Sequence, residues 1–355
     1  MKVDEYKLFI ENLTFDKIAI YGLSSRSKAC CDWFSEHFPN VEIIGFIPES
    51  STEKQCFCGI SVLSIDDIKQ RQEISVVYAE RDVSNIENLK IKHGLKNDFY
   101  VFYYVKPFFD TGDRNYPEQE IRELYQPNDA ETNMFLDNFF LAKEHGWSLL
   151  LSLDNLDWIA RYNKKYWDKD DNDLSVYDEL TFLDCGAYTG DSLEDFAKQY
   201  DVKLKYAYAL EADSTKQEAL KNTALTLGIA DSTQIIMSGV NDIAGDFFVE
   251  NAGLTTGKVV DAGEHSAQTV KIDDLDIKPI GQLCIKMDVE GFEMPALKGA
   301  AEVIKKYKPE MAICVYHHAD DIFEIPKYIR SLCPDYKFII RGGVHTVCYC
   351  STSRF

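Results

Sequence analysis

One stretch decides the fold of this chain: residues 182–192, which read FLDCGAYTGDS. An apolar strand ends in Asp184, glycines follow at positions 186 and 190, and the pattern predicts a helix from about Ser192. This order of strand, glycine turn and helix is the first crossover of a doubly wound α/β sheet, whose ligands lie beyond the carboxyl ends of the strands. The absence of side chains at the two glycines lets a ligand approach the backbone closely.

The glycine spacing distinguishes two kinds of ligand. The pattern D-x-G-x-x-x-G differs from the G-x-G-x-x-G of dinucleotide sites, in which a pyrophosphate sits on a helix N-terminus. An adenosyl amino acid has no phosphate, and its sulfonium and ammonium cations favour a nearby carboxylate. We therefore expect S-adenosylmethionine to contact Asp184, Gly186, Ala187, Tyr188 and Gly190. A tight turn without a ligand is the alternative for this segment taken alone.

A second apolar strand also ends in an acid. Residues 207–213 read AYALEAD and place Glu211 at the end of the strand, with Ala212 beside it. In a Rossmann-type fold, a carboxylate about 20 residues after the glycine turn accepts hydrogen bonds from the ribose hydroxyls. This register predicts Glu211 as the ribose ligand.

A third strand runs directly into several acids. Residues 285–293 read IKMDVEGFE, so Asp288, Glu290 and Glu293 follow an apolar run at the same edge of the sheet. Burying several carboxylates without a function is costly. We expect Asp288 to orient the donor or the acceptor, and Glu290 and Glu293 to contact the acceptor. The alternative is a structural cluster of ion pairs in which Lys286 balances one acid.

A fourth strand ends in aromatic and imidazole side chains. Residues 314–321 read CVYHHADD, and we expect Tyr316 on the acceptor side. Histidine titrates near neutral pH and can accept a hydroxyl proton, so His317 or His318 is the first candidate for a catalytic base and Asp288 the second. For either histidine, a packing or capping role is the alternative.

Strand and helix patterns alternate in two parts of the chain, which predicts two Rossmann-like doubly wound α/β domains joined by a helical segment. The first part covers about residues 15–108, with strands expected at 17–22, 42–47, 75–79 and 100–105. Aromatic residues at helical spacing fill the middle. The second part runs from 180 to the end. The expected domains are 1–108, a Rossmann-like accessory domain; 109–178, a helical linker or cover; and 179–355, the cofactor-binding domain.

Composition indicates which partners, which cysteine state and which compartment to expect. A formal net charge of −21 argues against a nucleic acid or an anionic membrane as partner, because binding phosphates requires clustered cations. The ten cysteines show no C-x-x-C spacing and are expected to be reduced. The N-terminus lacks the apolar core of a signal peptide and no run is long enough to span a bilayer, so we expect a cytoplasmic protein.

These motifs resemble the FkbM family of S-adenosylmethionine-dependent methyltransferases over about residues 180–350. Further matching pieces are residues 238–242 with Asn241, residues 269–275, and the run 285–300. The resemblance implies a class I methyltransferase fold, Asn241 and Asp288 near the cofactor, S-adenosylhomocysteine as product, and O-methylation of a sugar hydroxyl in a glycan, glycolipid or nucleotide sugar. A departure from the family pattern is the short turn 342–345, where His345 is expected on the acceptor side.

Two other functions are compatible with the sequence. The N-terminal part is similar to Rossmann-like modules of sugar-modifying enzymes, and an oxidoreductase that processes nucleotide sugars would bind nicotinamide near Gly22. However, Ser24 and Ser27 stand where a dinucleotide site needs glycine. A cofactor-binding scaffold without catalysis is the third interpretation. No ligand spacing demands a metal ion, although Asp288 and other acids could hold one, and a homo-oligomer is compatible with the sequence.

Overall fold

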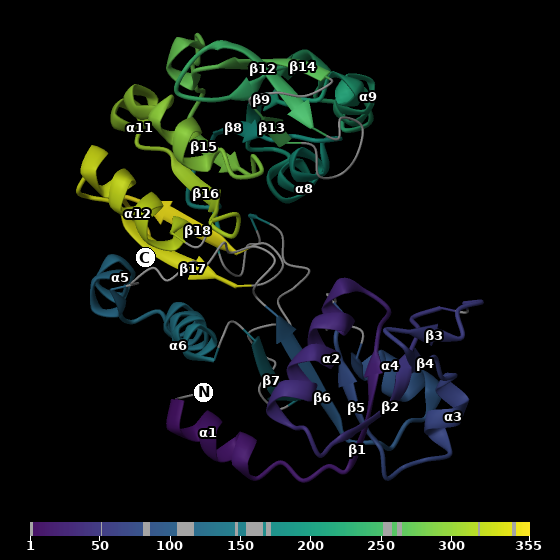
Figure 1. Cartoon of the computed structure of the whole chain (residues 1–355). Coiled ribbons are helices and arrows are strands. Elements are labelled where there is room, and N and C mark those ends of the chain that lie inside the picture. The colour runs from purple at the N-terminus through teal and green to yellow at the C-terminus, as the bar shows by residue number, and fades with distance from the viewer. Residues whose placement is uncertain are drawn as a thin grey trace. The chain divides into compact units, whose positions relative to one another are not determined.

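The computed structural model describes residues 3–50, 52–80, 86–104, 117–145, 148–153, 166–167, 172–250, 258–260, 265–318, 320–342 and 346–355. The chain divides into two compact units (Figure 1). Unit 1 comprises Met1–Thr111, Asn133–Asn163 and Gly342–Val344. Unit 2 comprises Gly112–Thr132, Lys164–Arg341 and His345–Phe355. The boundaries expected at residues 108 and 178 stay a prediction.

Unit 1 contains a five-stranded sheet with the order β2-β1-β5-β6-β7. The first four strands are parallel, and β7 is antiparallel to β6. The strands are β1 (Lys17–Tyr21), β2 (Glu42–Ile47), β5 (Ser75–Tyr78), β6 (Phe99–Tyr104) and β7 (Ser148–Ser152). The four parallel strands confirm the sequence-based expectation to within one residue or two. A small hairpin, β3 (Cys56–Phe57) with β4 (Ile60–Ser61), had not been expected.

Strand β7 corrects the expectation that residues 109–178 are helical. Helices α5 (Glu118–Leu124) and α6 (Ala130–Glu144) do form in this segment, but Ser148–Ser152 pairs with β6 along its whole length. Its three leucines are fully buried. A short apolar run fits a buried strand as well as a helix, so periodicity alone could not distinguish the two.

Helices of unit 1 complete its core. Helix α2 packs on β1 and β6 (Figure 1). It begins after Ser24, whose hydroxyl accepts from the backbone N–H groups of Arg26 and Ser27 and so satisfies the open helix end. Unit 1 includes α1 (Val3–Glu11), α2 (Ser25–His37), α3 (Ile65–Lys69) and α4 (Ile86–His93), together with most of α6.

Unit 2 contains a seven-stranded sheet with the order β10-β9-β8-β15-β16-β18-β17. Strands β10 through β16 in this order are parallel, and β18 is antiparallel to both its neighbours. The strands are β8 (Leu180–Cys185), β9 (Leu204–Leu210), β10 (Thr233–Ile236), β15 (Gln282–Met287), β16 (Glu310–Cys314), β17 (Lys337–Arg341) and β18 (Val347–Ser351). The strand order reverses between β8 and β15, which is the switch point of this sheet.

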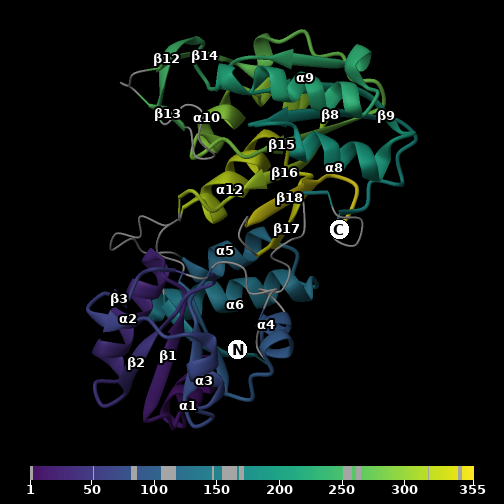
Figure 2. The ribbon, with the colours of Figure 1, turned by 90° about the vertical axis from the view of Figure 1, so that its right-hand side faces the viewer.

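Central strand β8 explains why this sheet forms. All six of its residues are buried, as expected for a parallel strand covered on both faces. Helix α8 packs on β8 and β9 (Figure 2), and the ring of Phe196 stacks on Phe182 with centroids 4.2 Å apart. Trp167 meets both rings edge-on and is fully buried. This aromatic cluster anchors the strand that carries the glycine turn.

The remaining elements of unit 2 surround the sheet. Strands β11 (Gly239–Val240), β12 (Gly245–Glu250), β13 (Lys258–Val260) and β14 (His265–Val270) form a second sheet. Besides α5, unit 2 includes the α-helices α8 (Asp191–Tyr200), α9 (Gln217–Thr226), α10 (Glu293–Lys298), α11 (Ala301–Tyr307) and α12 (Asp321–Leu332). Single 3₁₀ turns are η5 (Ser214–Lys216), η6 (Ala230–Ser232) and η7 (Ile272–Asp274).

A proline inside α12 is compensated from α5. Pro326 has no N–H, so the carbonyl of Ile322, four residues earlier, loses its helical partner. The hydroxyl of Tyr125, just beyond α5, donates to this carbonyl at 2.7 Å. Both Tyr125 and Ile322 are buried, so the bond joins α5 to α12 where water is excluded.

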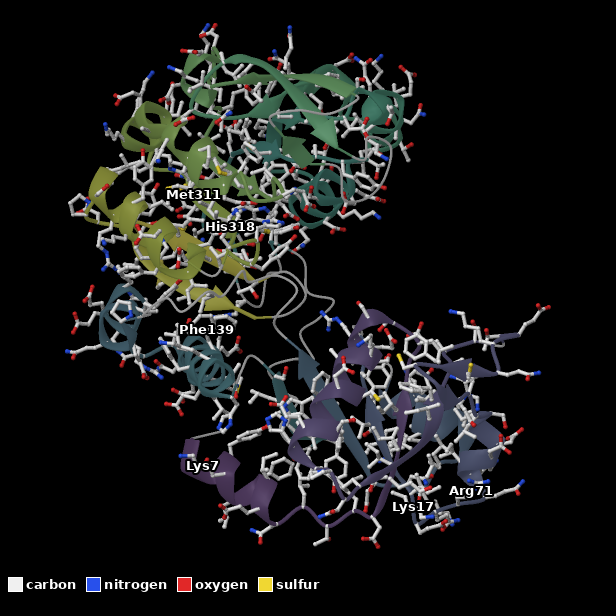
Figure 3. The ribbon with its side chains drawn as sticks, in the orientation of Figure 1. Lys7, Lys17, Arg71, Phe139, Met311 and His318 are labelled. Atoms are coloured by element: carbon white, nitrogen blue, oxygen red, sulfur yellow. The ribbon has the colours of Figure 1, made fainter. Side chains whose placement is uncertain are left out.

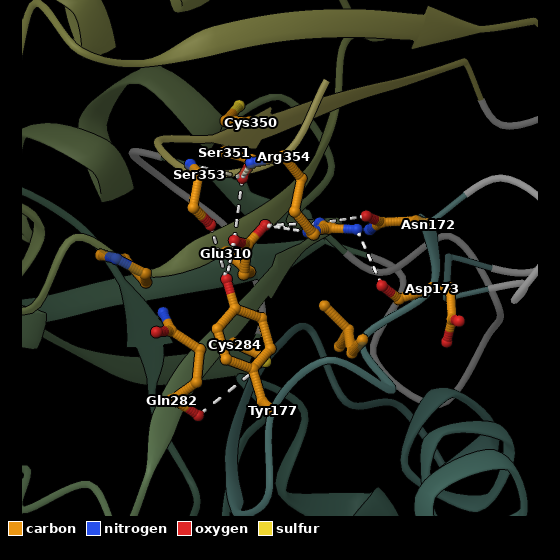
Figure 4. A network of polar contacts seen from close by, with 12 residues as sticks. Asn172, Asp173, Tyr177, Gln282, Cys284, Glu310, Cys350, Ser351, Ser353 and Arg354 are labelled. Carbon is orange, nitrogen blue, oxygen red and sulfur yellow. Dashed lines mark hydrogen bonds and ion pairs between the residues drawn. The ribbon is translucent and has the colours of Figure 1, made fainter.

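A buried polar network joins the start of β16 to the C-terminal residues (Figure 4). Glu310 is 1% exposed and accepts from the hydroxyls of Tyr177 at 2.5 Å and Ser351 at 2.9 Å. The guanidinium of Arg354 forms an ion pair with the same carboxylate and also contacts Asn172. The buried charge of Glu310 is therefore neutralised by Arg354.

Within the described residues, all ten cysteines are free thiols, as the sequence predicted. Eight of them are buried, and Cys56 and Cys58 are exposed. In the part of the chain that the structure describes, no helix has the length and apolar character needed to cross a membrane.

Candidate functional site

The candidate site lies at the carboxyl edge of the unit 2 sheet, around the switch point. Strands β8 and β15 are neighbours in register, with Asp184 opposite Lys286 and Cys185 opposite Met287. The β8 turn, the end of β9 and the residues after β15 and β16 therefore meet at one edge, as the four sequence motifs predicted.

Asp184 supports the glycine turn from below. Its carboxylate is fully buried, accepts from the hydroxyl of Ser192 at 2.6 Å and pairs with the ammonium of Lys286 at 3.1 Å. Lys286 also donates to the carbonyl oxygen of Gly186 at 2.6 Å. Burial lowers the pKa of Lys286, but Asp184 and Asp288 outweigh it, so the pKa is raised and the ammonium stays charged. That Asp184 itself contacts a donor stays a prediction.

Gly186 brings the β8 turn against the residues that follow β15. Its φ is +80°, and a Cβ at this position would lie 1.9 Å from the carbonyl oxygen of Asp288. Only glycine fits such a close approach of two backbones. Gly190, with φ +92°, precedes α8, and Ala187 between the two glycines is fully buried.

Glu211 follows β9 beside this turn. One carboxylate oxygen accepts from the backbone N–H of Tyr188 and the other from that of Asp213, both at 2.8 Å. Burial raises the pKa of Glu211, and these two hydrogen bonds oppose that effect. A carboxylate has about four lone-pair positions, so about two stay available to a ligand. Ala212, next in the chain, is half-buried.

Asn241 directly follows β11. Its side-chain oxygen accepts from the backbone N–H of Asp242 at 2.8 Å, and its side chain is 5% exposed. Among the described residues, no recorded side-chain contact joins Asn241 to the glycine turn. Its role in cofactor binding stays a prediction.

Asp288 receives two phenol hydroxyls. Tyr166 donates to one carboxylate oxygen at 2.6 Å, and Tyr316 donates to the other at 2.8 Å. The Asp288 carboxylate is therefore fixed in orientation from two directions. Sequence reasoning had not found Tyr166, because it lies 122 residues from Asp288 in a segment without a motif.

His317 lies among three carboxylates. Its Nδ1 is 2.9 Å from Glu293 Oε1, and its Nε2 is 3.4 Å from Glu290 Oε2 and 3.7 Å from Asp288 Oδ1. Burial lowers the pKa of His317, but Glu290 and Glu293 raise it by more, to about 10. In the free protein the ring therefore carries a proton at neutral pH, contrary to the expectation of a neutral base.

Glu293 lies beneath this histidine. It is fully buried at the start of α10, and its two oxygens accept from the backbone N–H groups of Val289 at 2.9 Å and Gly291 at 3.1 Å. The recorded contacts of the Glu293 carboxylate are all with groups of the protein. The side chain of the nearby Glu290 is more exposed. A direct acceptor contact of Glu293 stays a prediction.

His318 and His345 complete the expected set. His318 lies beyond β16, which carries Met311, and its Nε2 is 3.2 Å from the carbonyl oxygen of Gly291 (Figure 3). His318 is exposed and lies outside the three-carboxylate cluster. His345 lies outside the described residues.

The model of the Methyltransferase FkbM domain matches residues 184–340. A search of curated proteins found no match. Among solved structures, Methyltransferase FkbM from Methylobacillus flagellatus KT is similar, with 19% sequence identity and a TM-score of 0.58 over 98% of this chain and 93% of that chain.

Two further solved structures are far less similar. An uncharacterized protein from Listeria monocytogenes serotype 4b has 11% identity and a TM-score of 0.29, over 48% of this chain and 59% of its own. Precorrin-6y C5,15-methyltransferase from Geobacter metallireducens GS-15 has 11% identity and a TM-score of 0.28, over 50% and 81%. The likeness to the Methylobacillus protein supports a class I methyltransferase-like fold, and residues 184–340 are similar to the Methyltransferase FkbM domain.

Proposed function

We propose that this chain is an S-adenosylmethionine-dependent O-methyltransferase that modifies a sugar hydroxyl of a glycan, glycolipid or nucleotide sugar. One observation carries the proposal: a glycine turn and the carboxylate of Glu211 lie at the switch point, beside a cluster of hydrogen-bonding groups around Asp288. The glycine turn with Glu211 suits an adenosyl donor, and the cluster around Asp288 suits a hydroxylated acceptor.

The donor side fits an adenosyl cation. Glu211 keeps about two lone-pair positions for the ribose hydroxyls, and the backbone of the 186–188 turn can be approached closely because Gly186 has no side chain. Asp288 adds negative charge near a bound ammonium group. When bound, the donor supplies a methyl group on a sulfonium, a good leaving group.

The acceptor side must position a hydroxyl and receive its proton. Asp288 is held by Tyr166 and Tyr316, and Glu290 is partly exposed, so both can accept hydrogen bonds from sugar hydroxyls. In the transfer an O–CH₃ bond forms and the S–CH₃ bond breaks, while the hydroxyl proton passes to Asp288, since His317 already carries a proton in the free protein. Positioning of the donor and the hydroxyl accounts for most of the rate.

The unit 1 sheet argues against the oxidoreductase alternative. Ser27 donates to a carboxylate oxygen of Glu80 at 3.1 Å, and a Cβ on Gly22 would lie 1.9 Å from this oxygen. Glu80 therefore lies at the turn where the pyrophosphate of a dinucleotide would bind. Two anions in one place repel, which disfavours nicotinamide dinucleotides there.

Calorimetric titration of the full chain tests the proposal. S-adenosylhomocysteine should bind one molecule per chain, and NAD⁺ should show no binding. A screen of nucleotide sugars and glycans with isotopically labelled donor should then transfer label to one class of acceptor. Absence of S-adenosylhomocysteine binding would overturn the proposal, and binding without turnover on any acceptor would favour the scaffold interpretation.

A further inference from the structure

Two carboxylates that could bind a metal ion lie near Nε2 of His317, beyond the ends of β15 and β16. His317 Nε2 lies 3.4 Å from Glu290 Oε2 and 3.7 Å from Asp288 Oδ1. Ligand atoms bound at about 2.1 Å to one cation, at angles between octahedral and tetrahedral, lie about 3.0–3.4 Å apart. The two spacings from His317 Nε2 need only a small contraction to match. Asp288, Glu293 and His317 also place one ligand atom each within 4.8 Å of the others.

Glu293 faces the other side of the imidazole ring. Its Oε1 is 2.9 Å from Nδ1, and the backbone N–H groups of Val289 and Gly291 hold the carboxylate in place. A carboxylate on one ring nitrogen commonly orients a histidine whose other nitrogen binds a metal. Glu293 therefore suits an orienting role, and Nε2 is the nitrogen that faces Asp288 and Glu290.

The hydrogen bonding of His317 is incomplete without a further group. Its side chain is 10% exposed, and both ring nitrogens are buried without an aligned hydrogen bond, although carboxylate oxygens are close to each. A buried polar atom left in this state is unfavourable. The charges of the nearby carboxylates attract the protonated ring. After a slight rotation Nδ1 could donate to Glu293, and the deprotonated Nε2 could bind a cation.

We propose that Asp288, Glu290 and His317 bind one divalent transition-metal cation, with Glu293 as the residue that orients His317. Carboxylate ligands suit Mg²⁺ and Ca²⁺, but an imidazole nitrogen shifts the preference to Mn²⁺ or Zn²⁺. The remaining coordination positions would be taken by water. Nothing in the spacing of the sequence indicated this site, because His317 lies 27 residues after Glu290.

The cation also deepens the proposed function, and this step rests on that function being correct. A sugar hydroxyl that replaces a bound water has its pKa lowered by the cation. Its proton then leaves to solvent, the alkoxide oxygen attacks the methyl carbon, and the neutral thioether departs. In this state Asp288 is a ligand and not the base, so metal dependence decides between the two routes for the proton.

Binding is tested on the full chain after treatment with a chelator and its removal. Electron paramagnetic resonance of free Mn²⁺ should show one equivalent bound to the wild type. Asp288→Asn and His317→Gln should each weaken binding by at least tenfold, and Glu293→Gln by about 10–100-fold. The matched control is His318→Gln, which removes the adjacent exposed imidazole and should bind Mn²⁺ like the wild type.

Two results would overturn the proposal: no stoichiometric binding of Mn²⁺ or Zn²⁺ by the wild type, or equal loss in His318→Gln and His317→Gln. Binding of S-adenosylhomocysteine, measured on the same samples, shows that each variant is folded. It also separates the two proposals, because a chain that binds S-adenosylhomocysteine and transfers methyl groups but no metal leaves the methyltransferase assignment in place.

Discussion

Glu293 Oε1 lies 2.9 Å from Nδ1 of His317, and the Glu293 side chain is fully buried. Two backbone N–H groups fix the carboxylate, and the carboxylate in turn orients the imidazole through Nδ1. The other end of the ring faces Asp288 and Glu290. The orientation of His317 therefore depends on the buried carboxylate of Glu293.

Glu293→Gln should lower the rate of methyl transfer by about 10–100-fold, because the amide cannot orient the imidazole as a carboxylate does. Affinity for S-adenosylhomocysteine should stay within about twofold, since Glu211 is unchanged. Labelled-donor assays and calorimetry measure the two quantities. Glu302→Gln, at an exposed acid on α11, is the control. Equal losses of rate and donor affinity would mean that Glu293 is structural and would contradict this assignment.

Glu211→Gln should weaken binding of S-adenosylhomocysteine by about 10–100-fold. Hydrogen bonds to a charged group contribute about 1.5–3 kcal/mol, and the amide loses the charge as well as acceptor positions. Isothermal titration calorimetry measures the change. Glu218→Gln, on the exposed face of α9, should bind like the wild type. Unchanged affinity in Glu211→Gln would remove this residue from the donor site.

The strand ends of unit 2 were predictable because each is marked locally. In β8, β9 and β15 a buried apolar run stops at an acid or a glycine, and the parallel register then brings these residues to one edge. Gly186 was found for the same reason: only a residue without a side chain tolerates the approach of Asp288. The hydrophobic pattern of each strand, its length and the residue at its end can all be read from a short window of sequence.

The partners of these residues were not predictable. Tyr166 donates to Asp288 from a segment that sequence patterns indicated as helical cover, and no spacing relates the two. The sequence also suggested Glu293 as an acceptor contact, but burial depends on how α10 meets β15, which is a tertiary property. Likewise, His317 was expected to be neutral, whereas the two glutamates raise its pKa. Charge states follow from three-dimensional neighbours.

Lys286→Met should lower the free energy of unfolding by about 3–5 kcal/mol, because it leaves the fully buried carboxylate of Asp184 without its cation. Urea denaturation measures this loss. The double variant Lys286→Met/Asp184→Asn removes the unpaired charge and should recover part of the stability. Lys198→Met breaks an exposed pair with Glu194 and should change little. A Lys286→Met protein as stable as the wild type would show that the pair is dispensable.

Asp321 should make stability depend on pH. Burial and the charge of Glu293 raise its pKa from 3.8 to about 7, while the backbone N–H of His318 and the charge of His317 oppose the shift. The folded state thus binds the proton more tightly than the unfolded state. Its contribution to stability is complete below about pH 3.8 and is lost as the pH rises through about 7.

Asp321→Asn cannot ionise, so the loss of stability between these two pH values should be smaller in the variant, by up to a few kcal/mol. Urea midpoints measured across this range in the presence of a chelator give the difference. Asp231→Asn, at an exposed acid, should keep the wild-type slope. Parallel slopes for the wild type and Asp321→Asn would refute the prediction.

The pairing of Tyr125 with Ile322 predicts a specific non-additivity. Tyr125→Phe should lower the free energy of unfolding by about 1–3 kcal/mol, because the Ile322 carbonyl is left buried without a donor. Pro326→Ala restores the N–H that the helix lacks, so Tyr125→Phe should cost less in that background. Urea denaturation of the four proteins completes the cycle, with Tyr328→Phe on the same helix as control. Equal costs of Tyr125→Phe in both backgrounds would show that the hydroxyl does not replace the missing N–H.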